Sequence, residues 1–492
     1  MRQTYLITTL LFLFLQTIAC FSQELEFTDE ISETVGKFIR INTENAIFYK
    51  VNHSAISDLN TLEYTIVNPK DPAKKESVLS QPKFSKGGIS SFDHLFLAGD
   101  FIYEIHLIKS KDGIVGTGIV KRGLSDLKEI ENVLELDEWE VSFEENDREG
   151  FYLLSSINLY RISLNLEIRW KREFALFSDK NIRLNNIEVD KQLNLIVSLS
   201  VKKNTTIHFQ DSVSVSKSDL FLIVTDKFGT QKGIRPKVSE NIFVKYARFN
   251  YLNEAGELVG MFLTSELVKA PPPKKIYLGI GYAYFKWNDA GEILTTKCHA
   301  FSFSEFTDEN LKKYAEYYHF RPEKEGFDRT NYTVSTSHVE FLENGNVLYI
   351  SHTLMGVVTQ LQGSKLIYLL SPEGELLWTK LIPLNDNELY WSGDFFITDN
   401  KLHFLIREFV ASYEKGKYDF KFIRSMVNGK TVLLADRVID MENGQEVSNQ
   451  PLIANPSEKF HPLDVIYNKD NKVIVRYSSP GNKLERLLVI NY

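Results

Sequence analysis

Residues that bind metal ions in proteins gather in two parts of this sequence. His338, Glu340 and His352 supply imidazole and carboxylate groups, and residues 385–388 (NDNE) are rich in the oxygen ligands that calcium prefers. The two histidines and Glu340 would form a site only if the fold brought them together, which their spacing does not show. Residues 385–388 have the composition of a turn. We therefore predict no metal site.

Cys298 and His299 are the nearest approach to a nucleophile beside a base. They are neighbours in a strand-like segment, so their side chains should point to opposite faces and form no dyad. We expect Cys298 to be a small buried residue. Gly279 and Gly281 lack the third glycine and the following helix of a dinucleotide site. Since zinc-protease, hydrolase, phosphate-loop and calcium-loop motifs are also absent, we predict no catalytic residue and no cofactor.

One segment with the pattern of a helix could carry a ligand-binding rim. Thr307 can cap a helix over residues 307–320, and Leu311, Tyr314, Ala315 and Tyr318 would form its apolar stripe. The residues near the end of this insertion could then contact a carbohydrate or a peptide. They are Tyr317, His319, Phe320 and Arg321. The alternative is that these aromatic residues only pack against the rest of the protein.

Short segments with alternating residues, or with β-branched and aromatic residues, position all of these residues. Residues 101–108, 193–199 and 472–477 are typical of strands, and turns rich in Gly, Asn and Asp separate such segments from about residue 36 onward. The pattern predicts an all-β fold, with the insertion at 307–320 as its helical exception.

A repeated unit organises the strands. A strand, a tight turn and a second strand recur around Leu166, Gly229, Gly291 and Gly374, and a different hairpin turn precedes each copy. Two hairpins make four strands, and tandem four-stranded antiparallel units indicate a β-propeller. We count seven blades, with six or eight as alternatives.

Residues 370–380 (LSPEGELLWTK) carry a family resemblance. They resemble the last hairpin of a blade in quinoprotein-type (PQQ-like) propellers, where a glycine turn precedes an apolar pair and a tryptophan. The resemblance implies the propeller fold but no particular functional family. Most propellers with this blade motif bind no quinone, so we do not expect that cofactor.

The N-terminal residues indicate export. Arg2, the apolar residues 6–15 and the small residues before Glu24 predict a signal peptide over residues 1–22. Cleavage before Cys20 is the alternative, because residues 17–20 (TIAC) resemble a lipoprotein box and would leave a lipid anchor on Cys20. The ending FSQ resembles export signals of the Bacteroidetes group, which implies a periplasmic or extracellular protein of a bacterial envelope. We predict no membrane span in the remaining chain.

We assign residues 23–35 to a linker and residues 36–492 to the propeller, with residues 36–67 donating a strand that closes the last blade. The alternative is a separate β-domain over residues 24–125 and a propeller over 126–492.

The charge balance excludes one class of partner. The chain has 57 Lys and Arg against 65 Asp and Glu, a net charge of −8, with no long basic segment. Nucleic-acid binding is therefore not expected.

The connections expected between blades differ in length. The long ones, such as residues 202–216, 265–275 and 304–335, should emerge on one face, which we nominate as the binding face. We therefore expect a binding or scaffold protein that recognises a protein or an envelope polysaccharide through this long-loop face. The alternative is a hydrolase or lyase acting on a glycan or peptide, with acids from different blades meeting at the central channel.

Overall fold

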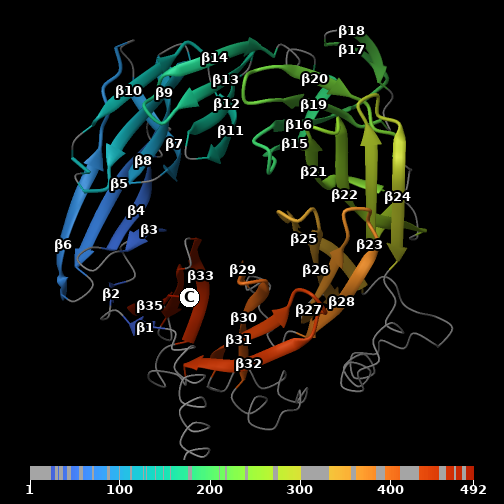
Figure 1. Ribbon diagram of the computed structural model, residues 1–492. Coiled ribbons are helices and arrows are strands. Elements are labelled where there is room, and N and C mark those ends of the chain that lie inside the picture. The colour runs from blue at the N-terminus through green and yellow to red at the C-terminus, as the bar shows by residue number, and fades with distance from the viewer. Residues whose placement is uncertain are drawn as a thin grey trace, which may run out of the picture.

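The computed structural model describes residues 24–300, 332–409 and 432–491, apart from short gaps within these ranges. These residues form an all-β ring of seven four-stranded antiparallel sheets and one five-stranded sheet, which is a β-propeller (Figure 1). The predicted helix at 307–320 and the rim residues Tyr317, His319, Phe320 and Arg321 lie outside the described residues, as does Cys20. Within the described ranges, no helix has the length and hydropathy needed to cross a bilayer.

The first four sheets, which we call blades 1 to 4, follow one another along the chain. Blade 1 contains β3 (Lys37–Ile41), β4 (Ala46–Ser54), β5 (Leu59–Asn68) and β6 (Asp71–Ser80). Blade 2 contains β7 (Ile89–Ala98), β8 (Phe101–Ser110), β9 (Gly113–Gly123) and β10 (Asn132–Leu136). Blade 3 contains β11 (Glu140–Asp147), β12 (Gly150–Ser155), β13 (Asn158–Ser163) and β14 (Ile168–Glu173). Blade 4 contains β15 (Ile182–Val189), β16 (Leu195–Val201), β19 (Phe221–Thr225) and β20 (Gln231–Ile234).

Blades 5 to 8 complete the ring. Blade 5 contains β21 (Ile242–Leu252), β22 (Glu257–Lys269), β23 (Lys275–Asn288) and β24 (Ile293–Ala300). Blade 6 contains β25 (Tyr332–Phe341), β26 (Val347–Met355), β27 (Gln362–Leu370) and β28 (Leu376–Pro383). Blade 7 contains β29 (Asp394–Thr398), β30 (Lys401–Phe409), β31 (Val432–Asp440) and β32 (Glu446–Ile453). Blade 8 contains β33 (His461–Lys469), β34 (Lys472–Ser478) and β35 (Leu484–Asn491), with β1 (Glu24–Phe27) and β2 (Ile31–Ser32) both paired to β35.

The described residues therefore form eight blades, which is one of the two alternatives to the seven that we favoured. Residues 36–67 do not close the last blade, because β3, β4 and β5 pair with one another and β6 completes their own sheet. The closing strand is β1, in the segment expected to be a linker, where Glu24 pairs with Asn491 and Phe27 with Leu488. The two ends of the described chain thus meet in blade 8.

The hydrophobic core lies between neighbouring blades. For example, Phe48 and Val67 of blade 1 pack with Ile474 and Leu487 of blade 8, and another cluster joins blade 1 to blade 2. Similar clusters join blades 2 to 3, 3 to 4, 4 to 5, 6 to 7 and 7 to 8. Blade 1, and with it most of residues 24–125, is therefore part of the ring.

The repeated turn expected from the sequence is present. Leu166, Gly229, Gly291 and Gly374 all have positive φ, between 63° and 84°. In each turn, the backbone N–H of this residue donates to the carbonyl three residues earlier, at 2.9 or 3.0 Å. Glycine suits this left-handed conformation because it has no Cβ. Leu166 adopts the same conformation although it has a Cβ. The strand pairing on either side therefore determines the conformation of the turn.

Aromatic side chains connect these turns to the preceding blade. In four blades, a Tyr O–H or Trp N–H donates to a backbone carbonyl in the last hairpin turn of the following blade. The pairs are Tyr103 with Leu164 at 2.6 Å, Trp170 with Lys227 at 3.0 Å, Tyr284 with Pro372 at 2.5 Å and Trp378 with Met441 at 2.8 Å. The tryptophan of the quinoprotein-like motif therefore holds two blades together.

We expect Trp378→Phe to lower the free energy of unfolding by about 1–2 kcal/mol, because the buried Met441 carbonyl would lose its donor. Trp170→Phe is the matched control, since the bond from Trp170 to Lys227 is exposed and water can replace the indole N–H. Urea unfolding of the two variants measures the difference. Equal losses would show that the buried hydrogen bond contributes nothing beyond the aromatic packing.

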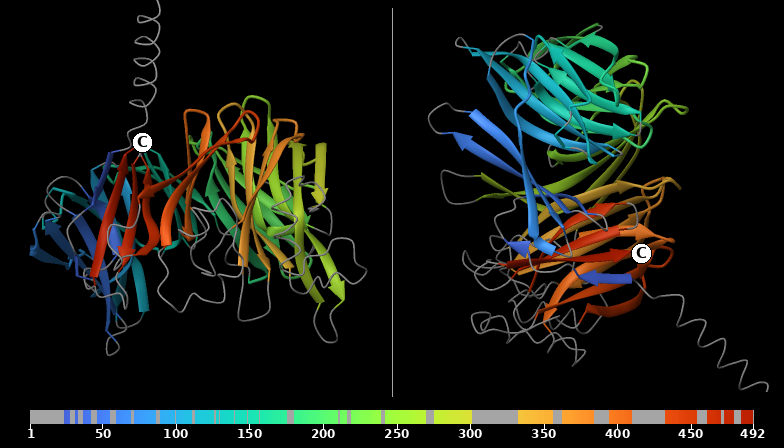
Figure 2. Two further views of the ribbon diagram at one scale, coloured as in Figure 1. Left: turned by 90° about the horizontal axis from the view of Figure 1, so that it is seen from below. Right: turned by 90° about the vertical axis from the view of Figure 1, so that its left-hand side faces the viewer.

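Because each sheet is antiparallel, the turns that join its first strand to its second and its third strand to its fourth emerge on one face of the ring (Figure 2). Residues 202–216 contain an additional hairpin of β17 (Thr205–Phe209) and β18 (Asp211–Val215). The loop expected at 265–275 is mostly strand, since β22 and β23 continue their pairing as far as Lys269 and Lys275. The apolar residues on both sides of the prolines extend that ladder. Residues 304–331 lie outside the described residues.

Candidate functional site

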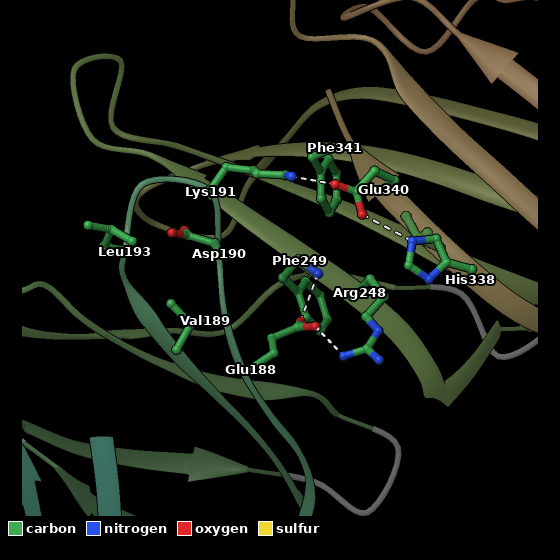
Figure 3. A pocket seen from close by; sticks show the side chains of 11 residues that line it. Glu188, Val189, Asp190, Lys191, Leu193, Arg248, Phe249, His338, Glu340 and Phe341 are labelled. Carbon is green, nitrogen blue, oxygen red and sulfur yellow. Dashed lines mark hydrogen bonds and ion pairs between the residues drawn. The ribbon is translucent and has the colours of Figure 1, made fainter. Parts of the chain in front are cut away.

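A cavity of about 430 Å³ lies where the first strands of blades 4, 5 and 6 approach one another. We call it the inner-strand pocket, because β15, β21 and β25 lie on the inner side of the ring (Figure 1). Figure 3 shows side chains from all three strands and from the turn after β15 around it. Its lining residues are Glu188, Val189, Asp190, Lys191, Leu193, Arg248, Phe249, His338, Val339, Glu340 and Phe341.

Glu188 and Arg248 form the ion pair that joins blade 4 to blade 5 in this pocket. Nη1 of Arg248 donates to Oε2 of Glu188 at 2.8 Å, and the backbone N–H of Phe249 donates to Oε1 at 2.9 Å. Burial raises the pKa of Glu188 to about 7, although these two contacts act in the opposite direction. Glu188 can therefore both accept and release a proton near neutral pH.

Asp190 has a structural role beside this pair. Its Oδ1 accepts from the backbone N–H groups of Gln192 and Asn194, and its Oδ2 accepts from the Asn194 amide and the Tyr251 backbone. Burial raises the pKa of Asp190, and these hydrogen bonds oppose that shift. With four donors on its carboxylate, Asp190 fixes the turn after β15 against blade 5 and so positions the neighbouring Lys191.

Lys191, Glu340 and His338 form the second charged group, which joins blade 4 to blade 6. The Lys191 ammonium forms an ion pair with Oε1 of Glu340, and Nε2 of His338 lies 3.0 Å from Oε2. Burial would raise the pKa of Glu340, but the hydrogen bonds from His338 and Lys191 outweigh it and hold the pKa below its ordinary value. The His338 ring also packs edge-on against Phe395 of blade 7, at 4.7 Å between ring centroids.

Two of the residues considered for a metal site therefore meet, since His338 and Glu340 are in contact. The side chain of His352 and residues 385–388 lie outside what the structure describes. Among the described residues, no group of three His, Cys, Asp or Glu side chains is placed to hold a metal ion.

The expectation for Cys298 was partly wrong. Its side chain is exposed, because β24 is the outermost strand of blade 5 and one of its faces meets solvent. His299 points the other way, as strand alternation predicts, and stacks on Tyr282 at 5.4 Å between ring centroids. The two residues form no dyad.

Glu188, Lys191 and Arg248 were not identified from the sequence. One signal could have found one of them: Glu188 and Glu340 each stand one residue before the end of the first strand of their blades. Charged residues at equivalent inner positions of different blades can converge on the inside of a ring.

A second ionisable cluster, between blades 1 and 2, has the properties of a structural network. Glu104 accepts hydrogen bonds from Tyr64 at 2.7 Å, Ser80 at 2.6 Å and Arg122 at 2.6 Å, and His106 Nε2 lies 2.9 Å away. All five residues are at most 4% exposed. Solvent and ligands therefore have no direct access to the Glu104 carboxylate.

No family model and no curated protein sequence matches this chain. Three solved structures with similar folds are a protein of unknown function from Bacteroides caccae, BamB from Moraxella catarrhalis and the polysaccharide lyase Uly1. The Bacteroides caccae protein is 11% identical, with a TM-score of 0.28 over 71% of this chain and 93% of that one. BamB is 8% identical, with a TM-score of 0.36 over 95% of this chain and 100% of that one. Uly1 is 12% identical, with a TM-score of 0.37 over 93% of this chain and 90% of that one. Likenesses this distant carry no conclusion about a substrate or partner.

Proposed function

We propose that this chain is an exported β-propeller of the bacterial cell envelope that binds an envelope polysaccharide, or a fragment of one, in the inner-strand pocket. One observation carries the choice of site: three first strands and the turn after β15 bring six ionisable side chains around one cavity. Hydrogen-bonding side chains beside an aromatic residue, here Phe341, suit a hydroxyl-rich ligand. Export rests on the signal-peptide pattern of residues 1–22.

The long-loop face stays a second predicted surface, for a protein partner. The rim residues Tyr317, His319, Phe320 and Arg321, which lie outside the described residues, are predicted to contribute to it. Much of this face lies outside the described residues, so the pocket is the better supported site.

A thermal-shift screen of the purified chain against envelope oligosaccharides and peptidoglycan fragments tests the proposal. A ligand at 100 times its Kd should stabilise the folded state by about 2.7 kcal/mol. The shift should fall in Lys191→Ala and remain in Lys297→Ala, because Lys297 has similar exposure and an ion pair with Glu375 away from the pocket. A panel without any saturable shift would reject saccharide binding.

A glycan hydrolase or lyase is the second candidate function, and two ionisable groups of the pocket support it. Glu188 titrates near neutral pH, and Glu340 orients the imidazole of His338. Glu188 and His338 could act as acid and base on a bound glycan. Glu188→Gln should then abolish turnover while ligand binding persists, measured as new reducing ends or unsaturated products. A wild-type protein that binds oligosaccharides and never cleaves them would exclude this candidate.

A further inference from the structure

The charged groups of the inner-strand pocket are arranged in two layers. The carboxylates are the more buried members of each contact: the side chain of Glu188 is 10% exposed and that of Glu340 is 28% exposed. Their partners face solvent, with Arg248 at 49%, Lys191 at 53% and His338 at 38%. A ligand that enters the cavity therefore meets nitrogen donors before it meets carboxylate oxygens.

The hydrogen bonds leave donor capacity on these exposed groups. A guanidinium carries five N–H donors, and the contact of Arg248 with Glu188 uses only its Nη1. An ammonium carries three donors, and Glu340 binds that of Lys191 through one oxygen. The carboxylates already accept elsewhere: both oxygens of Glu188 and both of Glu340 have partners. The pocket thus offers more donors than acceptors.

The charge of Glu188 strengthens this asymmetry. Because burial raises its pKa to about 7, Glu188 is partly protonated near neutral pH and offsets less of the positive charge of Arg248. Asp190 is 7% exposed and its oxygens accept from backbone and amide groups, so it is not presented to a ligand. The carboxylates of the pocket offset the charges of Arg248 and Lys191, so the preference for an anion rests on the exposed position of these two donors and not on a net positive charge.

From this arrangement we infer that the inner-strand pocket binds an oxyanion group of its ligand, with Arg248 and Lys191 as the principal contacts and His338 beside them. The ligand would be an acidic saccharide rather than a neutral one. Arginine suits this role because its planar guanidinium presents paired N–H groups to a carboxylate, sulfate or phosphate. The inference rests on the proposed function for the saccharide part and on the side-chain layering for the anion.

Isothermal titration with matched sugars tests the inference. Glucuronic acid, glucose 6-sulfate and glucose 6-phosphate carry the three oxyanions, and glucose is the neutral control. We expect at least one acidic sugar to bind about tenfold or more tightly than glucose, and its affinity to fall between 50 and 300 mM salt. The acidic sugar that binds most tightly identifies the oxyanion.

Variants connect the preference to the pocket. Arg248→Gln should weaken the acidic sugar at least about tenfold and leave glucose binding within about twofold. Arg235→Gln should change neither, because Arg235 is 45% exposed and paired with Asp219 outside the pocket. If Arg248→Gln does not fold, the salt dependence of binding and the comparison of sugars in the wild type still test the oxyanion inference.

The outcomes separate the two proposals. Equal binding of glucose and the acidic sugars would overturn the oxyanion inference and leave saccharide binding intact. Inorganic sulfate or phosphate binding as tightly as the sugars would support the oxyanion site and count against a saccharide. An absence of binding by sugars and inorganic anions alike would overturn both.

Discussion

Replacing Glu104 with alanine is expected to lower the free energy of unfolding by about 3–5 kcal/mol. The carboxylate is fully buried and lies at the centre of contacts from Tyr64, Ser80, His106 and Arg122. Removing it would leave the 3% exposed guanidinium of Arg122 without its counter-charge in the contact between blades 1 and 2. Urea unfolding followed by intrinsic fluorescence measures the loss.

Glu149→Ala is the matched control for this prediction. Its carboxylate also pairs with an arginine, Arg169 at 3.3 Å, but the Glu149 side chain is 58% exposed. Exposed ion pairs contribute little, so the control should lose less than about 1 kcal/mol. Similar losses in both variants would mean that the Glu104 network does not hold blade 2 against blade 1.

The parts of the fold that could be predicted are those fixed by local chemistry. The aligned turn residues Leu166, Gly229, Gly291 and Gly374 share one backbone conformation, because a tight hairpin needs a positive φ at that position whatever its surroundings. Strand alternation likewise placed Cys298 and His299 on opposite faces of β24. Both features depend on a few consecutive residues.

The blade count and the closing strand could not be predicted in this way. In blade 1, the last turn follows Asn68 and contains no glycine, so an alignment based on the glycine turns gives it no register. Closure depends on β1, which has four residues and pairs with β35 at the opposite end of the chain. Such a short strand has almost no sequence signal of its own, and its pairing is entirely long-range.

The pocket was missed for a similar reason. His338 and Glu340 are two residues apart in a strand, and so share a face, but nothing in their spacing indicates Lys191, which is 149 residues from Glu340. Glu188 and Arg248 are also on different blades. Packing of successive blades around the ring brings these residues together, and that packing is a property of the complete fold.

The second large effect concerns pH. Wild-type stability is expected to decrease relative to Glu188→Gln by on the order of 3 kcal/mol as the pH rises from about 4.5 to above 7. Burial raises the folded-state pKa of Glu188 from 4.5 to about 7, so between these values the folded state binds more protons than the unfolded state. Stability therefore falls with rising pH in this window. Glutamine cannot titrate, so the variant lacks this contribution.

Glu340→Gln provides a control of opposite sign from the same pocket. The pKa of Glu340 is lowered in the folded state, so its contribution to stability is complete above the ordinary glutamate pKa and is lost as the pH falls through the folded-state value. Comparing the unfolding of the wild type and both variants by urea from about pH 3 to 8 separates the two slopes, because the Glu340 slope lies below the ordinary glutamate pKa and the Glu188 slope above it. A flat difference between the wild type and Glu188→Gln across this range would show that Arg248 keeps Glu188 ionised. The acid-base role suggested for Glu188 would then fail, while the oxyanion inference would still rest on the exposed donors.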